Sequence, residues 1–184
     1  WAPEGEQEIF SLDEMIKIWD PARISKSPAI FDPLKLRAIN AAYIRALPAE
    51  EFRKLADPFI DQAVHVQIDR DLLCANLQPR CEVLEDIPPQ LDFFDAVLPI
   101  DAEMYRNKKQ KTTPESAKEA LSALLPVLEA QTDWTRDAIF EACKTLAEQM
   151  EKKNGWLLFP LGIALSGKAR TPGGGTDLAA MMGK

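Results

Sequence analysis

The most informative part of the sequence is its C-terminal stretch, Pro160-Leu-Gly-Ile-Ala-Leu-Ser-Gly-Lys-Ala-Arg-Thr-Pro-Gly-Gly-Gly-Thr-Asp-Leu-Ala-Ala-Met-Met-Gly-Lys184. It predicts an apolar helix, a glycine-rich turn and a second short helix. Three successive glycines lack a Cβ, which lets the backbone approach another molecule closely. The following helix would direct unpaired N–H groups and the positive end of its dipole toward the turn. The stretch therefore indicates a corner suited to a polar or anionic partner, with a plain connection between helices as the alternative.

Helical signals continue through the rest of the chain. Ser11 and Glu14 fit a capping box, and Asp32-Pro33 and Thr113-Pro114 fit helix starts with proline at the first position. No alternating run is long enough to predict a sheet. The expected helices cover residues 15–19, 33–46, 50–56, 69–77, 91–97, 114–130, 135–154, 156–166 and 176–182. The fold class is therefore predicted to be all-α, with two packed helical subdomains at residues 1–105 and 106–184.

Composition excludes several classes of protein. With 46% hydrophobic and 28% charged residues, the 184-residue chain can bury a core. No apolar run approaches the ~18–20 residues that a membrane-spanning helix needs. Three cysteines, Cys74, Cys81 and Cys143, lack Cys-x-x-Cys spacing, which argues against a disulfide framework and a zinc site. A cytoplasmic protein without a bound metal is expected.

The net charge of −7 argues against a generally basic nucleic-acid binder. Phosphate contacts are nevertheless made by individual Lys and Arg residues, and two places concentrate them. The segment 106–111 is the densest basic run, and Lys168 and Arg170 flank the glycine-rich turn. The alternative for segment 106–111 is a solvated linker.

Catalysis finds little support in the residues. The single histidine, His65, lies among aliphatic residues and is expected at the core or its edge. The sequence contains no G-x-x-x-x-G-K-[ST] loop, no G-x-S-x-G elbow and no H-x-x-x-H pair. No catalytic residue is assigned.

Three motifs resemble those of one enzyme family. Phe31-Asp-Pro-Leu-Lys-Leu-Arg-Ala-Ile-Asn-Ala-Ala-Tyr-Ile-Arg45 is similar to the F-D-x-x-K-L-x-x-x-N-x-x-Y-I-R signature of bacterial-type glutamyl-tRNA synthetases. Trp1–Phe10 resembles the W-x-P-E-G-x-E-x-F stretch of that family, and 160–173 resembles its closing P-L-x-x-A-L-S-G-x-x-x-T-P-G motif. The matches follow the family's order and cover almost the whole chain.

The resemblance implies the helical anticodon-binding region of such an enzyme, of the helical cage type. The family's H-I-G-H and K-M-S-K-S motifs are missing, which implies a piece that cannot aminoacylate alone and holds no cofactor. The full-length enzyme would use ATP and Mg to attach glutamate to its tRNA. The implied partners are glutamate tRNA, with glutamine tRNA left open, and the catalytic core in cis. A cytoplasmic monomer is expected.

The resemblance also assigns candidate tRNA-binding residues. Arg80 falls at the position whose arginine reads the third anticodon base, with capping of the preceding helix as the alternative. Thr171, Pro172, Gly173 and Gly174 match the contact area for the first two bases. The remaining candidates are basic residues for phosphate contacts, namely Lys35, Arg37, Arg45, Lys168 and Arg170. The family commonly has arginine where this chain has Gly162, and the effect of that difference is left open.

A helical protein–protein interaction module is the second hypothesis. It rests on the acidic balance and on Leu178, Met181 and Met182, which are expected to be exposed near the C-terminus. Four aromatic residues could stack on bases, but their leucine-rich neighbourhoods favour core packing: Trp134, Phe140, Trp156 and Phe159.

Overall fold

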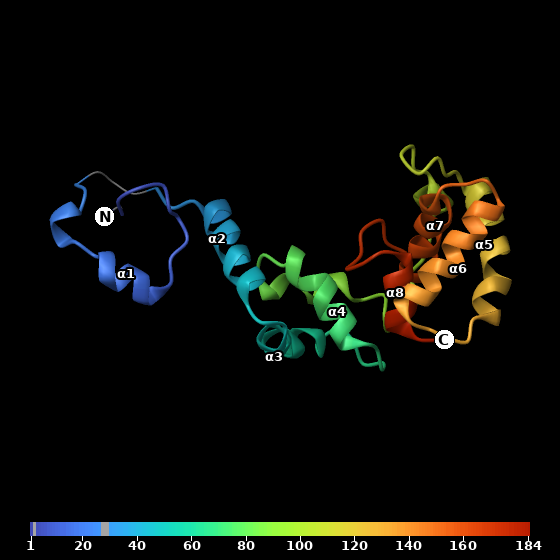
Figure 1. The fold of residues 1–184 in the computed structure, drawn as a ribbon, viewed down its shortest axis with the longest axis horizontal. Coiled ribbons are helices and arrows are strands. Elements are labelled where there is room, and N and C mark those ends of the chain that lie inside the picture. Colours follow the sequence, from blue (N-terminus) through green and yellow to red (C-terminus); the bar gives the residue numbers. More distant parts are fainter. Residues whose placement is uncertain (2, 27–29) are drawn as a thin grey trace.

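The computed structural model describes residues 1, 3–26 and 30–184 and folds them mainly as helices (Figure 1). The α-helices are α1 Leu12–Ile18, α2 Pro33–Ala46, α3 Ala49–Ile60, α4 Arg70–Leu77, α5 Pro114–Ala130, α6 Arg136–Gln149, α7 Asn154–Ser166 and α8 Gly175–Met182. Short 3-10 turns are η1 Pro21–Arg23, η2 Gln78–Arg80, η3 Leu84–Asp86, η4 Pro88–Gln90 and η5 Ala102–Tyr105. Within these residues, the β-structure is limited to one isolated bridge between Asn107 and Thr112. The predicted all-α class is confirmed.

The molecule is elongated (Figure 1). Helix α1 lies at one end, α2, α3 and α4 occupy the middle, and α5, α6, α7 and α8 form a bundle at the other end. Ala2, one position of the Trp1–Phe10 motif, lies outside the described residues. Among the helices of the described part, none has the length and apolar character needed to cross a membrane.

Two hydrophobic cores hold the fold together. The first joins α2, α3, α4 and the irregular segment 81–94, through residues that include Ile44, Phe52, Ile60, Leu73, Leu77, Ile87, Leu91 and Phe93. The second lies inside the bundle and includes Ala120, Leu124, Ile139, Cys143, Trp156, Leu157 and Leu161. The boundary between residues 105 and 106 stays a prediction.

Helix α8 belongs to both cores. Leu178 and Met181 pack into the first core with exposed fractions of 0% and 1%, while Ala179 packs into the second. The expectation that Leu178 and Met181 are exposed was wrong, because their face of α8 is covered by the middle helices. Met182 is partly buried against the first core.

The helix starts follow the predicted local signals. Ser11 Oγ accepts from Glu14 N at 3.2 Å, and the Glu14 carboxylate accepts from Ser11 N at 2.7 Å. Asp32 accepts from two backbone N–H groups at the start of α2. Helix α7 ends at Gly167, whose φ of +63° is the left-handed conformation of a glycine stop.

Two expected helix features are wrong. Residues 91–97 form no helix: Leu91, Phe93 and Phe94 turn into the first core, and the Asp95 carboxylate accepts from His65 N at 2.8 Å. Helix α6 ends at Gln149, and the left-handed residue that follows is Glu151, with φ +54°. Asn154, where that helix was expected to end, instead begins α7.

In the described chain, three helices contain an internal proline, at Pro58, Pro126 and Pro160. Pro160 lies within α7 and does not interrupt it, and Pro58 lies within α3, which continues to Ile60 instead of ending near residue 56. Pro160 is fully buried, and burial offsets the missing backbone hydrogen bond.

Helices α7 and α8 approach each other at backbone distance. A Cβ placed on Gly175 would lie 2.7 Å from the carbonyl oxygen of Leu158 and 2.9 Å from the backbone nitrogen of Gly162. A Cβ on Gly162 would be 3.6 Å from Gly175 N, an ordinary contact. The contact therefore requires glycine at position 175 and tolerates a small side chain at position 162.

We predict that Gly175→Ala lowers the free energy of unfolding by about 1–3 kcal/mol, because the two helices must separate. Gly162→Ala is the matched control, and it should be neutral or stabilise by up to about 1 kcal/mol as a helix-interior Gly→Ala change. Chemical denaturation followed by circular dichroism measures both values. Equal effects of the two substitutions would contradict the close approach.

The three thiols are predicted to make stability depend on alkaline pH. Burial raises the pKa of Cys74, Cys81 and Cys143 from 9.0 to about 11. Below pH 9 the thiols are protonated in both states; as the pH rises from 9 toward 11, only the unfolded thiols ionise, which lowers the free energy of unfolding. Denaturation midpoints between pH 9 and 11 measure this loss of stability. The triple Cys→Ala variant should lose less stability over the same range.

Candidate nucleic-acid interface

A cavity of about 440 Å³ lies between the glycine-rich turn, one face of α7 and the end of η2. Six of its lining residues are predicted site residues. Five belong to the turn and the loop before it, Lys168, Arg170, Thr171, Gly173 and Gly174, and the sixth is Arg80. Apolar residues Leu158, Phe159, Ile163 and Ala169 form much of the wall. The structure thus brings together six of the ten candidates named from the sequence.

The turn is held by its own hydrogen bonds. Thr171 Oγ1 donates to the carbonyl of Gly173 at 2.7 Å, and Gly173 N donates to the carbonyl of Thr171 at 2.9 Å. Gly173 has φ +121°, and a Cβ there would lie 2.7 Å from the Cβ of Asp177, which makes glycine necessary. Pro172, another candidate, is buried and does not line the cavity.

An internal carboxylate compensates the start of α8. Asp177 accepts from Gly174 N at 2.7 Å and from Arg136 Nε at 3.0 Å. A carboxylate in the first turn neutralises part of the positive helix end. The start of α8 is therefore a poor anion-binding site, and the turn is better suited to a neutral polar partner.

Arg80 reaches the turn from the other half of the molecule. It ends η2, directly after α4, and its Nη1 donates to the carbonyl of Thr171 at 3.4 Å. Gln78 anchors η2 by donating to the carbonyls of Ile44 and Leu47 at 3.0 and 2.8 Å. In the described part of the chain, the Arg80 side chain does not cap α4, which was the alternative expected from the sequence.

The two cations of the loop before the turn differ in their surroundings. Lys168 is 23% exposed; its Nζ donates to the carbonyl of Pro89 at 2.9 Å and pairs with Asp92. It therefore fixes the loop to the segment around η4. Arg170 is exposed at the rim, and its side chain forms no ion pair or hydrogen bond with the described residues.

Gly162 lines the same cavity. Because it has no side chain, the space above this turn of α7 stays open where the resembling family commonly has arginine. Phe159, expected in the core, instead forms part of the cavity wall and is partly buried. The helical period alone could not separate these positions, because α7 is apolar on all sides and faces both a core and a cavity.

The candidates on α2 do not line the cavity. Lys35 pairs with Glu8 at 2.6 Å, and Arg37 pairs with Glu82 at 2.9 Å and with Asp86. The hydrogen bonds to Glu82 and Asp86 raise the pKa of Arg37. Arg45 is exposed and unpaired among the described residues. Of the three, Arg45 has the side chain most available to a partner.

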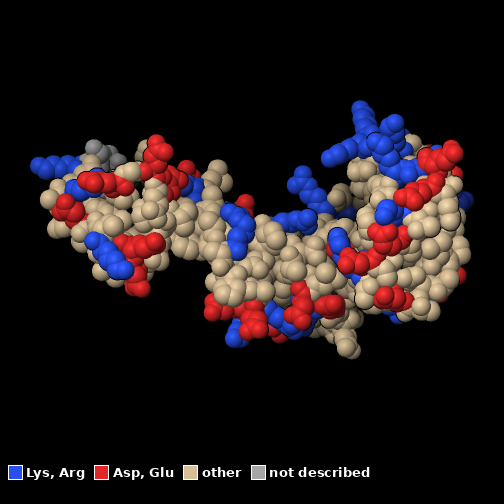
Figure 2. Space-filling model, in the orientation of Figure 1, with Lys and Arg blue, Asp and Glu red and all other residues tan. Residues whose placement is uncertain are grey.

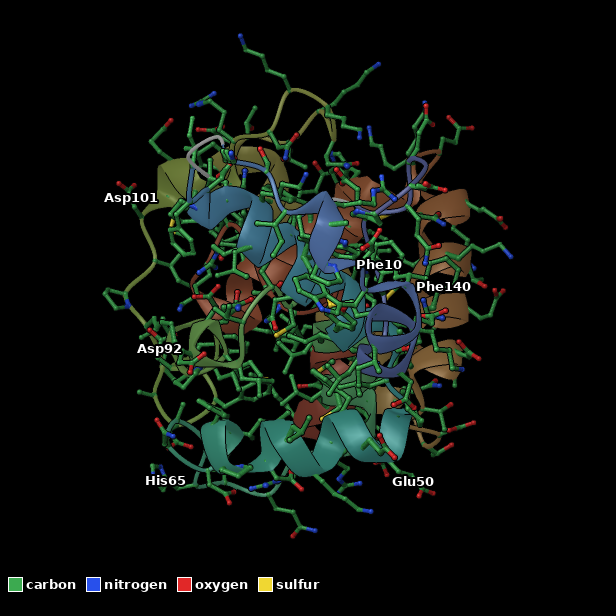
Figure 3. All side chains as sticks on the ribbon, turned by 90° about the vertical axis from the view of Figure 1, so that its left-hand side faces the viewer. Phe10, Glu50, His65, Asp92, Asp101 and Phe140 are labelled. Carbon is green, nitrogen blue, oxygen red and sulfur yellow. The ribbon has the colours of Figure 1, made fainter. Side chains whose placement is uncertain are left out.

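The other aromatic candidates mostly support the fold. Trp156 is buried in the second core, and Trp134 Nε1 donates to the carbonyl of Ala179 at 2.8 Å. Phe140 is half-buried on α6, at the side of the molecule (Figure 3).

His65 belongs to the surface. Its ring is exposed and paired with Asp95, whose pKa is lowered first by the backbone N–H of His65. Figure 3 shows His65 at the lower edge of the molecule, level with Glu50 at the other end of α3. Across the described residues, no group of three His, Cys, Asp or Glu side chains could hold a metal ion.

We predict that Asp177→Ala lowers the free energy of unfolding by about 1–2 kcal/mol, because two hydrogen bonds to a mostly buried carboxylate are lost. Asp137→Ala is the matched control, since Asp137 pairs with the same Arg136 but is 86% exposed, against 15% for Asp177. Its effect should stay within about 0.5 kcal/mol. Urea denaturation compares the two variants, and a neutral Asp177→Ala would contradict this role.

Comparison with known proteins identifies the family. A family model described as an anticodon binding domain matches residues 39–184. Over 184 residues the chain is 43% identical to a glutamate–tRNA ligase of Clostridium botulinum, and it is 42% identical over 185 residues to one of Clostridium acetobutylicum. It spans 38% of the length of each relative.

Solved structures agree with this assignment. The crystal structure of a glutamate tRNA ligase from Elizabethkingia meningosepticum matches the whole chain with a TM-score of 0.82 and 26% identity, over 36% of its own length. A glutamate-tRNA synthetase from Elizabethkingia anophelis, at 23% identity, has the same fold over 35% of its length, with a TM-score of 0.76. The resemblance inferred from the sequence motifs is confirmed, and the chain belongs to the anticodon binding domain family, corresponding to that region of glutamate–tRNA ligases.

Proposed function

We propose that this chain binds the anticodon loop of a tRNA, and that this tRNA is the one specific for glutamate. The observation that carries the proposal is the cavity in which Arg80 meets the Thr171–Gly174 turn. The family and the names of the relatives support the choice of partner. Glutamine tRNA remains a second substrate to test.

The cavity has the materials for reading unpaired bases. Bases in RNA loops are recognised by stacking and by hydrogen bonds to their exposed edges. Phe159 and Leu158 supply apolar surface, and Arg80 and Arg170 supply donors. The Thr171 hydroxyl, which donates to the carbonyl of Gly173, can still accept a hydrogen bond. A volume of about 440 Å³ lies within the ~300–1,000 Å³ typical of small-molecule sites, enough for a nucleobase.

Arg80 is suited to specify the third anticodon base. Its guanidinium presents several donors in a fixed plane, which a base edge can accept in pairs. The 3.4 Å hydrogen bond to Thr171 is long, so that a base can replace it at low cost while the loop still positions the side chain. Arg170, on the same rim, is free to contact the adjacent phosphate or base.

The activity of the longer protein is a further part of the proposal. Attachment of glutamate to the tRNA would use ATP and Mg bound outside this chain, and this chain would hold the tRNA in register for that reaction. We expect it to act as a monomer in contact with the catalytic core in cis. The protein–protein module is disfavoured, because Leu178 and Met181, on which it depended, are buried.

The test is binding of glutamate tRNA and of the same tRNA with its third anticodon base changed. We predict that Arg80→Ala reduces the preference for the original base by roughly tenfold, in line with ~1–3 kcal/mol for a good base contact. Arg45→Ala is the control: an exposed arginine outside the cavity can change affinity but should leave the preference unaltered. Fluorescence anisotropy gives both dissociation constants, and an undiminished preference in Arg80→Ala would refute the assignment.

A further inference from the structure

A second groove, separate from the cavity, lies between a hairpin and the turn that joins α6 to α7. We call it the lysine groove. It has a volume of about 360 Å³ and is lined by Lys109, Gln110, Lys111, Glu151, Lys152, Lys153 and Trp156. Lys108 adds a further cation on the hairpin.

The hairpin is a defined structure. Asn107 and Thr112 exchange two backbone hydrogen bonds of 3.0 Å each. The Asn107 side chain accepts from Lys109 N at 3.0 Å and from Gln110 N at 3.1 Å, while Thr112 Oγ1 donates to the carbonyl of Tyr105 at 2.7 Å. The basic run at 106–111, for which a solvated linker was the alternative, thus presents its lysines from a fixed turn.

The opposite wall is equally well organised. Lys152 N donates to the carbonyl of Ala147 at 2.8 Å, which closes the turn after α6, and Lys152 Nζ lies 5.4 Å from the centre of the Trp156 ring. Gln110 contacts the position where a Cβ of residue 155 would stand, so that Gly155 lets the hairpin pack against α7. The two walls therefore hold the lysines in one place before any partner binds.

The charges of the groove are uncompensated. All five lysines are exposed, and in the described chain none pairs with a carboxylate, whereas Arg37, Arg70 and Lys168 do. Glu151 is the one acidic residue of the lining. Figure 2 shows the blue side chains of this loop gathered at the upper edge, and in Figure 3 nitrogen-tipped side chains project from it into solvent. In a chain of net charge −7, such a cluster selects an anionic partner.

The position of the lysine groove indicates which anionic partner binds it. Trp156, Phe159 and Ile163 stand at i, i+3 and i+7, on one face of α7; the first lines the lysine groove, and the other two line the cavity. At 1.5 Å per residue, the two sites lie roughly 5–10 Å apart along the helix. One RNA strand can reach both.

We infer that the lysine groove binds the phosphodiester backbone of the same tRNA whose anticodon loop enters the cavity. This inference rests on the proposed function and adds a second contact surface to it. An anionic membrane fits less well, because the aromatic ring of the groove is buried and no exposed apolar side chain lines it for insertion.

The experiment compares two sets of Lys→Gln changes, which keep side-chain length and remove charge. The test variant carries Lys109→Gln, Lys111→Gln, Lys152→Gln and Lys153→Gln. The control carries Lys17→Gln and Lys54→Gln, two exposed lysines on α1 and α3 that form no ion pair among the described residues. Circular dichroism checks that both fold.

Binding of fluorescent glutamate tRNA is measured between about 50 and 200 mM salt. We predict that the test variant loses at least about tenfold in affinity at the lower salt, and that its salt slope falls by roughly 0.7 for each phosphate contact removed. The preference for the original third base should persist, because base reading belongs to the cavity.

An affinity and salt slope equal to those of the control would overturn the inference while leaving the proposed function intact if the base preference persists. No base preference in the unchanged chain would instead refute the proposed function, and no tRNA binding at all would overturn both. Loss of binding to phosphatidylserine vesicles, with tRNA binding unaltered, would assign the groove to membranes and also refute the inference.

Discussion

Helices α7 and α8 meet at backbone distance at Gly162 and Gly175, and this contact positions both hydrophobic cores and the cavity. It holds α8 so that one face reaches the core of the middle helices and the other reaches the bundle. The same contact fixes the turn before α8 against α7, opposite the end of η2. The cavity lined by Arg80, Thr171, Gly173 and Gly174 exists because this short helix is shared by both cores.

The overall acidity of the chain is compatible with an RNA partner because opposite charges are distributed unevenly. Arg70 and Arg53 on the middle helices are engaged by carboxylates, with Arg70 contacting Asp57 at 3.2 Å and Asp61 at 2.6 Å. Figure 2 shows a mostly red group of side chains at the lower edge of the middle of the molecule and a blue cluster at the top of the bundle. Phosphate contacts depend on the local field within about one Debye length of ~8–10 Å, where the unpaired cations dominate.

Local chemistry explains which parts of the fold the sequence could predict. Caps such as Asp32 and Gly167 act within one turn of helix, and the helix ends expected there agree with the structure. The capping box at Ser11 also forms, although α1 begins at Leu12 and not at residue 15. Residues 91–97 were expected to form a helix and do not, because their side chains interact with residues far away in the sequence. One example is Asp95, whose carboxylate accepts from His65 N. Site residues could be predicted where they lie in a recognisable motif, as Arg80 does. The hydrogen bond from Lys168 to the carbonyl of Pro89 joins residues 79 positions apart, so no local sequence pattern predicts it.

The two surfaces on α7 suggest different roles: the cavity would determine which tRNA is recognised, and the lysine groove would supply much of the binding affinity. Hydrogen bonds to base edges distinguish sequences but contribute only in the correct register, whereas lysine–phosphate contacts attract any RNA. A protein that was basic throughout would bind RNA in many orientations. Clustering five unpaired lysines around one groove beside the cavity, on a chain of net negative charge, penalises orientations that bring phosphates near carboxylates. The orientation that remains favourable is the one that places the loop against Arg80 and the Thr171–Gly174 turn.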